Sequence, residues 1–236
     1  MQKLFKPQLI ALAVVSIYTL PTAALAEETD IKTEAIEVIS NTPLQGFGLR
    51  KELIPSNIQT INSEDIENEN NLTIADALNN SITGVSINQV QNNPYQPNVN
   101  YRGFTASPLL GTQQGLSVFV DGVRVNEVFG DVVSWDLIPM NAVSKINLIP
   151  GSNPVFGLNT LGGSLSLQTK SGRNNPGGSI QVLGGSWGRA ATEAEYGAVG
   201  DNGVDFFISG NLYRITRSVW LGVIYYRAAD KRSWNP

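Results

Sequence analysis

Residues 116–125 read LSVFVDGVRV, and this stretch decides the fold of the middle of the chain. Two runs rich in β-branched and aromatic residues, 116–120 and 123–125, flank the dipeptide Asp121-Gly122. An Asp-Gly pair between such runs is a strong hairpin signal, because a type I′ turn needs positive φ at both central residues. The stretch therefore predicts a β-hairpin.

Short strands and short helices surround this hairpin. Thr73, followed by Asp76, is typical of a helix N-terminus, and Asn62 or Ser63 can cap a more polar helix just before it. The predicted elements are strands at 57–61, 85–87, 145–149 and 164–169 and helices at 64–69 and 74–79. This mixture predicts an α+β domain of short mixed strands and helices over 55–172.

The pattern changes after Lys170. A linker rich in Gly and Asn occupies 171–178, and the residues beyond it alternate with a period of two up to about 213. One face carries Ile180, Val182, Ala194, Tyr196, Ala198, Val204, Phe206, Ile208 and Leu212, and the other carries Gln181, Glu193, Glu195, Gly197, Asp205, Ser209 and Asn211. Three strands of about ten residues with these faces predict the beginning of an antiparallel transmembrane β-barrel over 173–213. The alternative is an antiparallel sheet with one face in water.

The first 26 residues have the layout of a secretory signal peptide. Two lysines precede an apolar run at 9–20, and Ala-Leu-Ala follows at 24–26. The apolar run is shorter than the roughly 20 residues that a membrane-spanning helix needs. We therefore expect cleavage between Ala26 and Glu27.

Composition excludes several kinds of chemistry. The chain has 236 residues, no Cys, no His and a formal net charge of −4. Disulfides, thiolate metal sites and His-based catalysis are therefore absent, and the acidic balance argues against nucleic-acid binding. Residues 184–188 fit the Gly-x-Ser-x-Gly pattern of a hydrolase nucleophile, but no His base exists for it. We expect no enzyme, no cofactor and no metal site.

Three separated stretches carry a common set of motifs in a fixed order. They are Ala-Asp-Ala-Leu at 75–78 with Gly-Val at 84–85, Tyr-Arg-Gly-Phe at 101–104 with 118–124, and the long stretch 138–170. Together they resemble the plug domain of the TonB-dependent outer-membrane receptors over most of 57–172. The resemblance implies a signal peptide, a periplasmic tail, a globular plug, and a large barrel that the plug fills.

The resemblance also implies partners and a location. A TonB-type energy-transducing protein would bind a TonB box in the tail, 27–54, by adding a strand to extended backbone. The only candidate for the box is Ile36, Glu37, Val38, Ile39 and Ser40. The receptor would lie in the outer membrane of a Gram-negative cell, with plug and tail reached from the periplasm, and would take up a scarce substrate such as a ferric siderophore or a similar chelate.

Individual residues follow from the same resemblance. Arg102 and Arg124 match family positions that brace the plug against the barrel, and Lys145 stands where an Arg is usual. The acid common two positions later is replaced by Asn147. Aromatic and polar residues of the long loops are candidates for the substrate-facing surface: Tyr95, Gln96, Phe104, Phe129 and Trp135.

The end of the chain departs from the barrel pattern. A transporter barrel of this kind has about 22 strands, far more than the residues after 172 can form. Alternation fails from Arg214 onward, and 214–236 hold five basic residues and one acid. We therefore expect a truncated receptor in which 214–236 are out-of-frame sequence. The alternative is a genuine small protein, a stand-alone periplasmic plug-like binding or interaction domain.

Overall fold

The structure, a computed structural model, divides the chain into two units, Met1–Ile36 and Glu37–Pro236. The residues that it describes all lie in the second unit: 38–40, 48–50, 55–69, 71, 73–89, 93–185, 189–201, 203–215, 218–221 and 225–229. The expected signal peptide, with its cleavage between Ala26 and Glu27, lies outside the described residues.

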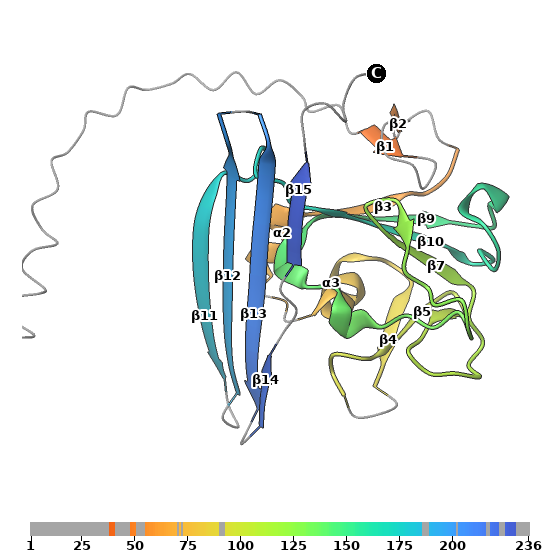
Figure 1. The fold of residues 1–236 in the computed structure, drawn as a ribbon. Coiled ribbons are helices and arrows are strands. Elements are labelled where there is room, and N and C mark those ends of the chain that lie inside the picture. The colour runs from red at the N-terminus through yellow and green to blue at the C-terminus, as the bar shows by residue number, and fades with distance from the viewer. Residues whose placement is uncertain are drawn as a thin grey trace, which may run out of the picture. The chain divides into compact units, whose positions relative to one another are not determined.

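A five-stranded mixed sheet forms the centre of the plug (Figure 1). Its strands are β3 (Gln59–Asn62), β7 (Leu116–Val120), β8 (Val123–Arg124), β9 (Val143–Pro150) and β10 (Gly163–Thr169). The order is β3-β9-β10-β7-β8, in which β10 and β7 run parallel and the other neighbours antiparallel. Since β3 is an edge strand, only β9 holds it in the sheet.

The predicted hairpin joins β7 to β8. Asp121 and Gly122 have φ of 48° and 82°, the two positive values that a type I′ turn requires. The Asp121 carboxylate also accepts a hydrogen bond from the backbone N–H of Thr169, 2.9 Å away. The turn is thereby tied to the end of β10.

Two short helices follow β3. In α2 (Ser63–Asn68), the carboxylate of Asp65 accepts a hydrogen bond from the backbone N–H of Asn62, which fixes the start of the helix. In α3 (Ile74–Ser81), the Thr73 hydroxyl accepts from a backbone N–H of the first turn. One face of α3 is fully apolar and buried, so this helix packs into the core of the plug.

A three-stranded antiparallel sheet completes the plug. Its strands β4 (Val85–Asn88), β5 (Asn98–Tyr101) and β6 (Phe104–Ala106) pair in sequence order. Among the described residues, 3-10 helices lie in the connections: η2 (Trp135–Leu137), η3 (Met140–Ala142) and η4 (Pro154–Phe156). The largest fully buried side chains of the shared core are Tyr101, Leu78, Ile61, Leu116, Ile146, Leu148, Leu165 and Leu167. The predicted α+β plug is confirmed.

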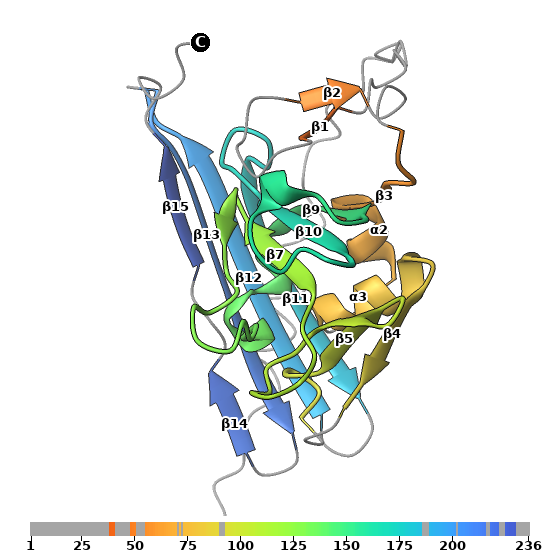
Figure 2. The same ribbon diagram turned by 90° about the vertical axis from the view of Figure 1, so that its right-hand side faces the viewer.

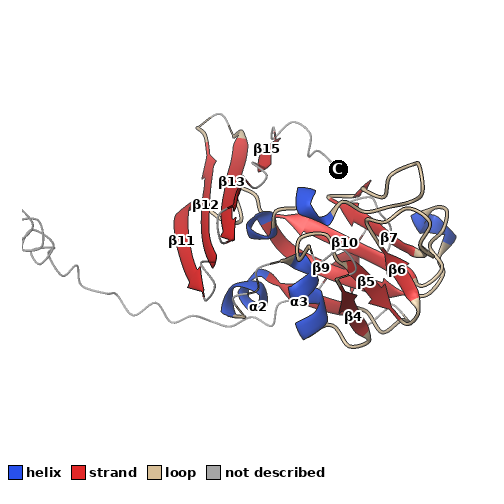
Figure 3. Cartoon of the chain, turned by 90° about the horizontal axis from the view of Figure 1, so that it is seen from below, coloured by secondary structure: helices blue, strands red, loops and turns tan. Residues whose placement is uncertain are grey.

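Long antiparallel strands form a second, separate sheet after the plug (Figures 2 and 3). They are β11 (Gly177–Gly185), β12 (Arg189–Val199), β13 (Asp205–Ile215), β14 (Ser218–Leu221) and β15 (Tyr225–Ala229). The order is β11-β12-β13-β14, and β15 also pairs with β13. These strands match the beginning of an antiparallel receptor barrel.

Residues beyond the expected barrel strands join the same sheet. β14 pairs with 212–215 of β13, and β15 pairs with 205–209. β12 pairs with one edge of β13, and β14 and β15 both pair with the other edge, one after the other along the strand. The interpretation of 214–236 as out-of-frame sequence remains a prediction.

Candidate functional site

The β11–β13 sheet turns an apolar face outward. Ile180 and Val182 are 78% and 71% exposed, and Tyr196 points to solvent as well. On the opposite face, the polar residues Asp205 and Ser209 are buried together with the aromatic residues Phe207 and Tyr213. An ordinary sheet with one wet face buries its apolar side, whereas a membrane barrel turns that side outward to lipid. The structure therefore shows the polarity of a barrel wall.

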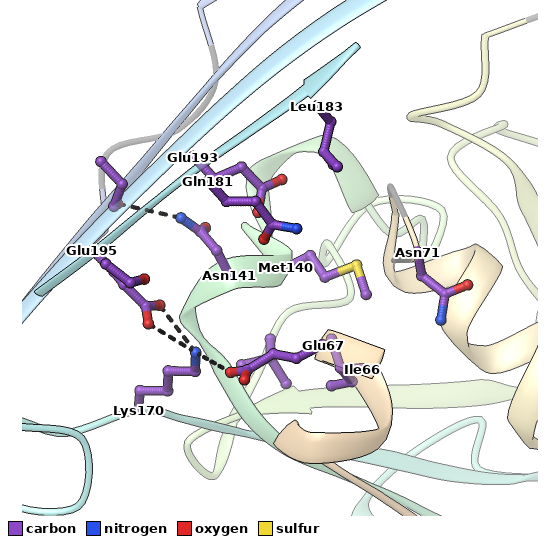
Figure 4. A pocket seen from close by; sticks show the side chains of 13 residues that line it. Ile66, Glu67, Asn71, Met140, Asn141, Lys170, Gln181, Leu183, Glu193 and Glu195 are labelled. Atoms are coloured by element: carbon purple, nitrogen blue, oxygen red, sulfur yellow. Dashed lines mark hydrogen bonds and ion pairs between the residues drawn. The ribbon is translucent and has the colours of Figure 1, made fainter. Parts of the chain in front are cut away.

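Lys170 connects the plug to this wall. The residue follows β10 directly, and its side chain is only 5% exposed. Its ammonium lies 3.0 Å from Oε2 of Glu195 in β12 and 3.0 Å from Oε1 of Glu67 in α2 (Figure 4). Two carboxylates thus neutralise one buried cation, and the three charges join a plug helix, the end of the plug sheet and a barrel strand.

Two further polar groups cross the same interface. The side-chain amide of Asn141, in η3, donates to the backbone oxygens of Gly210 at 3.2 Å and Ala194 at 3.4 Å, which are paired residues of β13 and β12. The guanidinium of Arg227, in β15, donates to the Thr169 hydroxyl at 3.0 Å and lies 3.5 Å from the Asp121 carboxylate. Hydrogen bonds to backbone oxygens and ion pairs therefore attach the plug to β12, β13 and β15.

A cavity of about 340 Å³ lies beside the Lys170 cluster, between the plug and the first two strands of the wall (Figure 4). Its lining mixes polar and apolar side chains on both sides, with Leu183 and Ala194 among the residues of the wall. The lining residues include Ile66, Glu67, Met140, Asn141, Gln181 and Glu193. The cavity separates α2 from the inner face of the sheet.

Two of the three residues predicted from the family resemblance as contacts between plug and barrel, Arg102 and Arg124, have partners inside the plug. Arg102 places its guanidinium 5.1 Å from the ring centre of Tyr101. Arg124 pairs with Asp131 at 2.8 Å, inside the plug. Lys145 is half-buried in β9. Lys170, Asn141 and Arg227 make polar side-chain contacts between the plug and the strands. A bracing role for Arg102, Arg124 and Lys145 stays a prediction.

The substrate-facing candidates differ in exposure. Phe129 is 78% exposed on a loop. Tyr95 stacks against Tyr213 of β13 with ring centres 4.8 Å apart, and Gln96 beside it is half-buried. Phe104 packs against the plug core. Trp135 is buried and donates its indole N–H to a backbone oxygen. Only Phe129 among these five is free to present its whole ring outward.

The candidate TonB box is partly described. Its last three residues form β1 (Val38–Ser40), which pairs antiparallel with β2 (Gly48–Arg50). Ile36 and Glu37 lie outside the described residues. A strand paired on one side has a second edge for main-chain hydrogen bonds, which is the chemistry that strand addition uses.

Sequence reasoning missed Lys170, Asn141 and Arg227. The alternation after 178 does turn Glu193 and Glu195 toward the plug, and a buried carboxylate needs a partner. This pattern predicts a cationic partner but does not identify it, because Lys170 lies 25 residues before Glu195, outside the alternating strands.

Two kinds of feature are missing from the described part of the chain. No group of three or more acidic side chains is arranged to hold a metal ion. No helix there is long and apolar enough to cross a membrane.

Residues 50–164 match the family model of the TonB-dependent Receptor Plug Domain. Three solved structures share the fold. They are the ferripyoverdine receptor of the outer membrane of Pseudomonas aeruginosa (15% identity, TM-score 0.54, 75% of this chain and 22% of the receptor), the ferric preacinetobactin receptor BauA of Acinetobacter baumannii (15%, 0.53, 70% and 24%) and the siderophore receptor PiuA of Acinetobacter baumannii (20%, 0.52, 67% and 21%). No curated protein sequence matches the chain.

A plug joined to the first strands of a barrel defines the class of outer-membrane receptors. Residues 50–164 are the plug domain of a TonB-dependent receptor, as their match to the family model shows. Its place is accordingly the outer membrane of a Gram-negative cell. The chain spans less than a quarter of the length of each of the three receptors above.

Proposed function

We propose that this chain forms the plug and first barrel strands of a receptor for energised uptake of a scarce substrate, a ferric siderophore or a similar chelate. The neighbours in fold include receptors whose names specify ferripyoverdine and ferric preacinetobactin. Transport in this proposal needs a closed barrel, because an open sheet edge in lipid leaves backbone groups unpaired. In this receptor, the plug formed by this chain would fill the lumen of the barrel and bind the substrate from outside.

Energy would reach the plug through the tail. A TonB-type protein would add a strand to the box at 36–40, and the pull would act on 27–54 first. Substrate can expose the box only through a difference in its affinity for two states of the plug. The proposed receptor makes and breaks no covalent bond, so we infer that it is not an enzyme.

The observation that carries the proposal is the outward apolar face of β11–β13. A stand-alone periplasmic domain would expose Ile180 and Val182 to water at a cost of about 1.5–3 kcal/mol for each side chain. A lipid-facing wall has no such cost. The polarity of the sheet therefore favours the receptor over the stand-alone periplasmic domain.

Cell fractionation tests this proposal on the full chain. We expect the wild-type chain, within the closed barrel of its receptor, in the outer-membrane fraction. Val182→Arg puts a charge on the lipid face, which costs about 2–4 kcal/mol at mid-membrane, and should move the chain out of that fraction. Gln181→Arg, the matched control on the inner face, should leave it there. A wild-type chain found soluble in the periplasm would instead support the stand-alone domain.

A further inference from the structure

The two carboxylates that meet Lys170 are in different surroundings. The Glu195 side chain is 19% exposed and contacts the ammonium with both oxygens, at 3.0 and 3.2 Å. The Glu67 side chain is 60% exposed and contacts it with one oxygen. Water and salt screen an exposed ion pair far more than a buried one. The Glu195 contact is therefore the stronger of the two.

Helix α2 buries little apolar surface against the plug. Ile66 is its only buried residue, and the strand that precedes it, β3, pairs with β9 over just four residues at the edge of the plug sheet. The ion pair from Glu67 to Lys170 also holds the helix, and its C-cap, Glu69, accepts hydrogen bonds from the Ser81 hydroxyl of α3. A helix held in this way belongs to the least stable part of a domain.

The same helix forms one wall of the cavity. Ile66 and Glu67 line it from the plug, opposite Glu193 and Glu195 of β12 (Figure 4). Met140, 5% exposed, lies in the lining between them. The cavity already meets solvent beside Glu67 and Gln181, which are exposed, and movement of α2 away from the sheet would widen it and uncover Met140.

We propose that Lys170 is an asymmetric clasp, which holds α2 weakly through Glu67 and β12 firmly through Glu195. When the Glu67 contact breaks, α2 moves away from the sheet and the cavity widens. The end of β10 stays attached to the barrel wall through Glu195. Lys170 acts as a positioning residue. The direction of opening, from the tail through β3 to α2, rests on the proposed function; the clasp itself rests on the contacts and exposures above.

Thiol labelling of Met140→Cys in the full chain tests the clasp. Because the natural sequence has no Cys, the introduced thiol is the only one. The probe is N-ethylmaleimide, and mass spectrometry follows the rate of alkylation. Glu67→Gln should raise that rate about three- to tenfold over Met140→Cys alone. Glu64→Gln, which removes an exposed carboxylate from the same helix, is the matched control and should leave the rate unchanged.

Stability separates the two contacts of the clasp. Glu67→Gln should leave the thermal unfolding midpoint equal to that of Glu64→Gln. Glu195→Gln should lower it clearly, because Lys170 then remains buried beside a single screened carboxylate. Equal labelling rates in Glu67→Gln and Glu64→Gln would overturn the proposal, and so would equal losses of stability in Glu67→Gln and Glu195→Gln. Neither measurement uses a TonB-type protein or a substrate, so the clasp can fail while the receptor function stands.

Discussion

Gly162 shows how little free space the plug has around Phe104. A Cβ at this position would lie 2.4 Å from Cδ2 of Phe104, closer than carbon atoms can approach. Gly162→Ala should therefore destabilise the plug by about 1–3 kcal/mol, because the half-buried ring has to shift. Gly184→Ala is the matched control, since nothing lies within 4 Å of its Cβ. Denaturant unfolding compares the two, and equal midpoints would contradict the packing described.

Trp135 and Phe129 separate a core aromatic residue from a surface one. Trp135 is 4% exposed, whereas the Phe129 ring stands free. Trp135→Ala should cost about 3–5 kcal/mol of unfolding free energy. Phe129→Ala should stay within about 0.5 kcal/mol of wild type and lower only substrate binding. If Phe129→Ala unfolds as easily as Trp135→Ala, the loop is packed differently from the structure.

At the scale of single elements, the sequence predicted those whose signals are local. The Asp121-Gly122 pair is sufficient for the hairpin, because the turn type depends on the φ of these two residues alone. Thr73 likewise caps α3 through its own first turn. Helix α3 nevertheless continues to Ser81, past the predicted end at 79, because its C-cap residue, Ile82, is buried and donates its backbone N–H to the oxygen of Leu78. Element ends depend on such tertiary packing and are harder to predict.

Strand β1 carries the prediction for the tail. Ile39→Pro removes a backbone N–H from the candidate box and should weaken binding of the full chain to the soluble domain of a TonB-type protein by at least about tenfold. Ile39→Val keeps that N–H and is the control at the same position. Binding can be measured by titration calorimetry. Undiminished binding of Ile39→Pro would exclude 36–40 as the box.

At the scale of the whole molecule, alternation after 178 predicted which face of the sheet is apolar, because side chains of a strand alternate strictly. It could not identify the contacts to the plug. Lys170 meets Glu67 from 103 residues away and Glu195 from 25. Arg227 meets Asp121 across 106 residues. Pairings at such separations depend on how two sheets dock, which no local pattern records.

The β11–β13 sheet has charged side chains on its inner face and apolar side chains on its outer face. Glu195 is turned inward because Lys170 receives it there. Ile180 and Val182 are turned outward because they alternate in β11 with Gln181, which faces inward. One polarity therefore serves both the lipid contact and the attachment of the plug.

The central claim is this polarity, and site-directed spin labelling of the full chain in lipid vesicles tests it most directly. Single cysteines at Ile180, Val182 and Gln181 can each carry a nitroxide, since no native thiol competes. We predict that labels at 180 and 182 collide freely with oxygen and little with a water-soluble nickel complex, and that the label at 181 shows the opposite preference. High collision rates with the nickel complex at 180 and 182 would contradict the account.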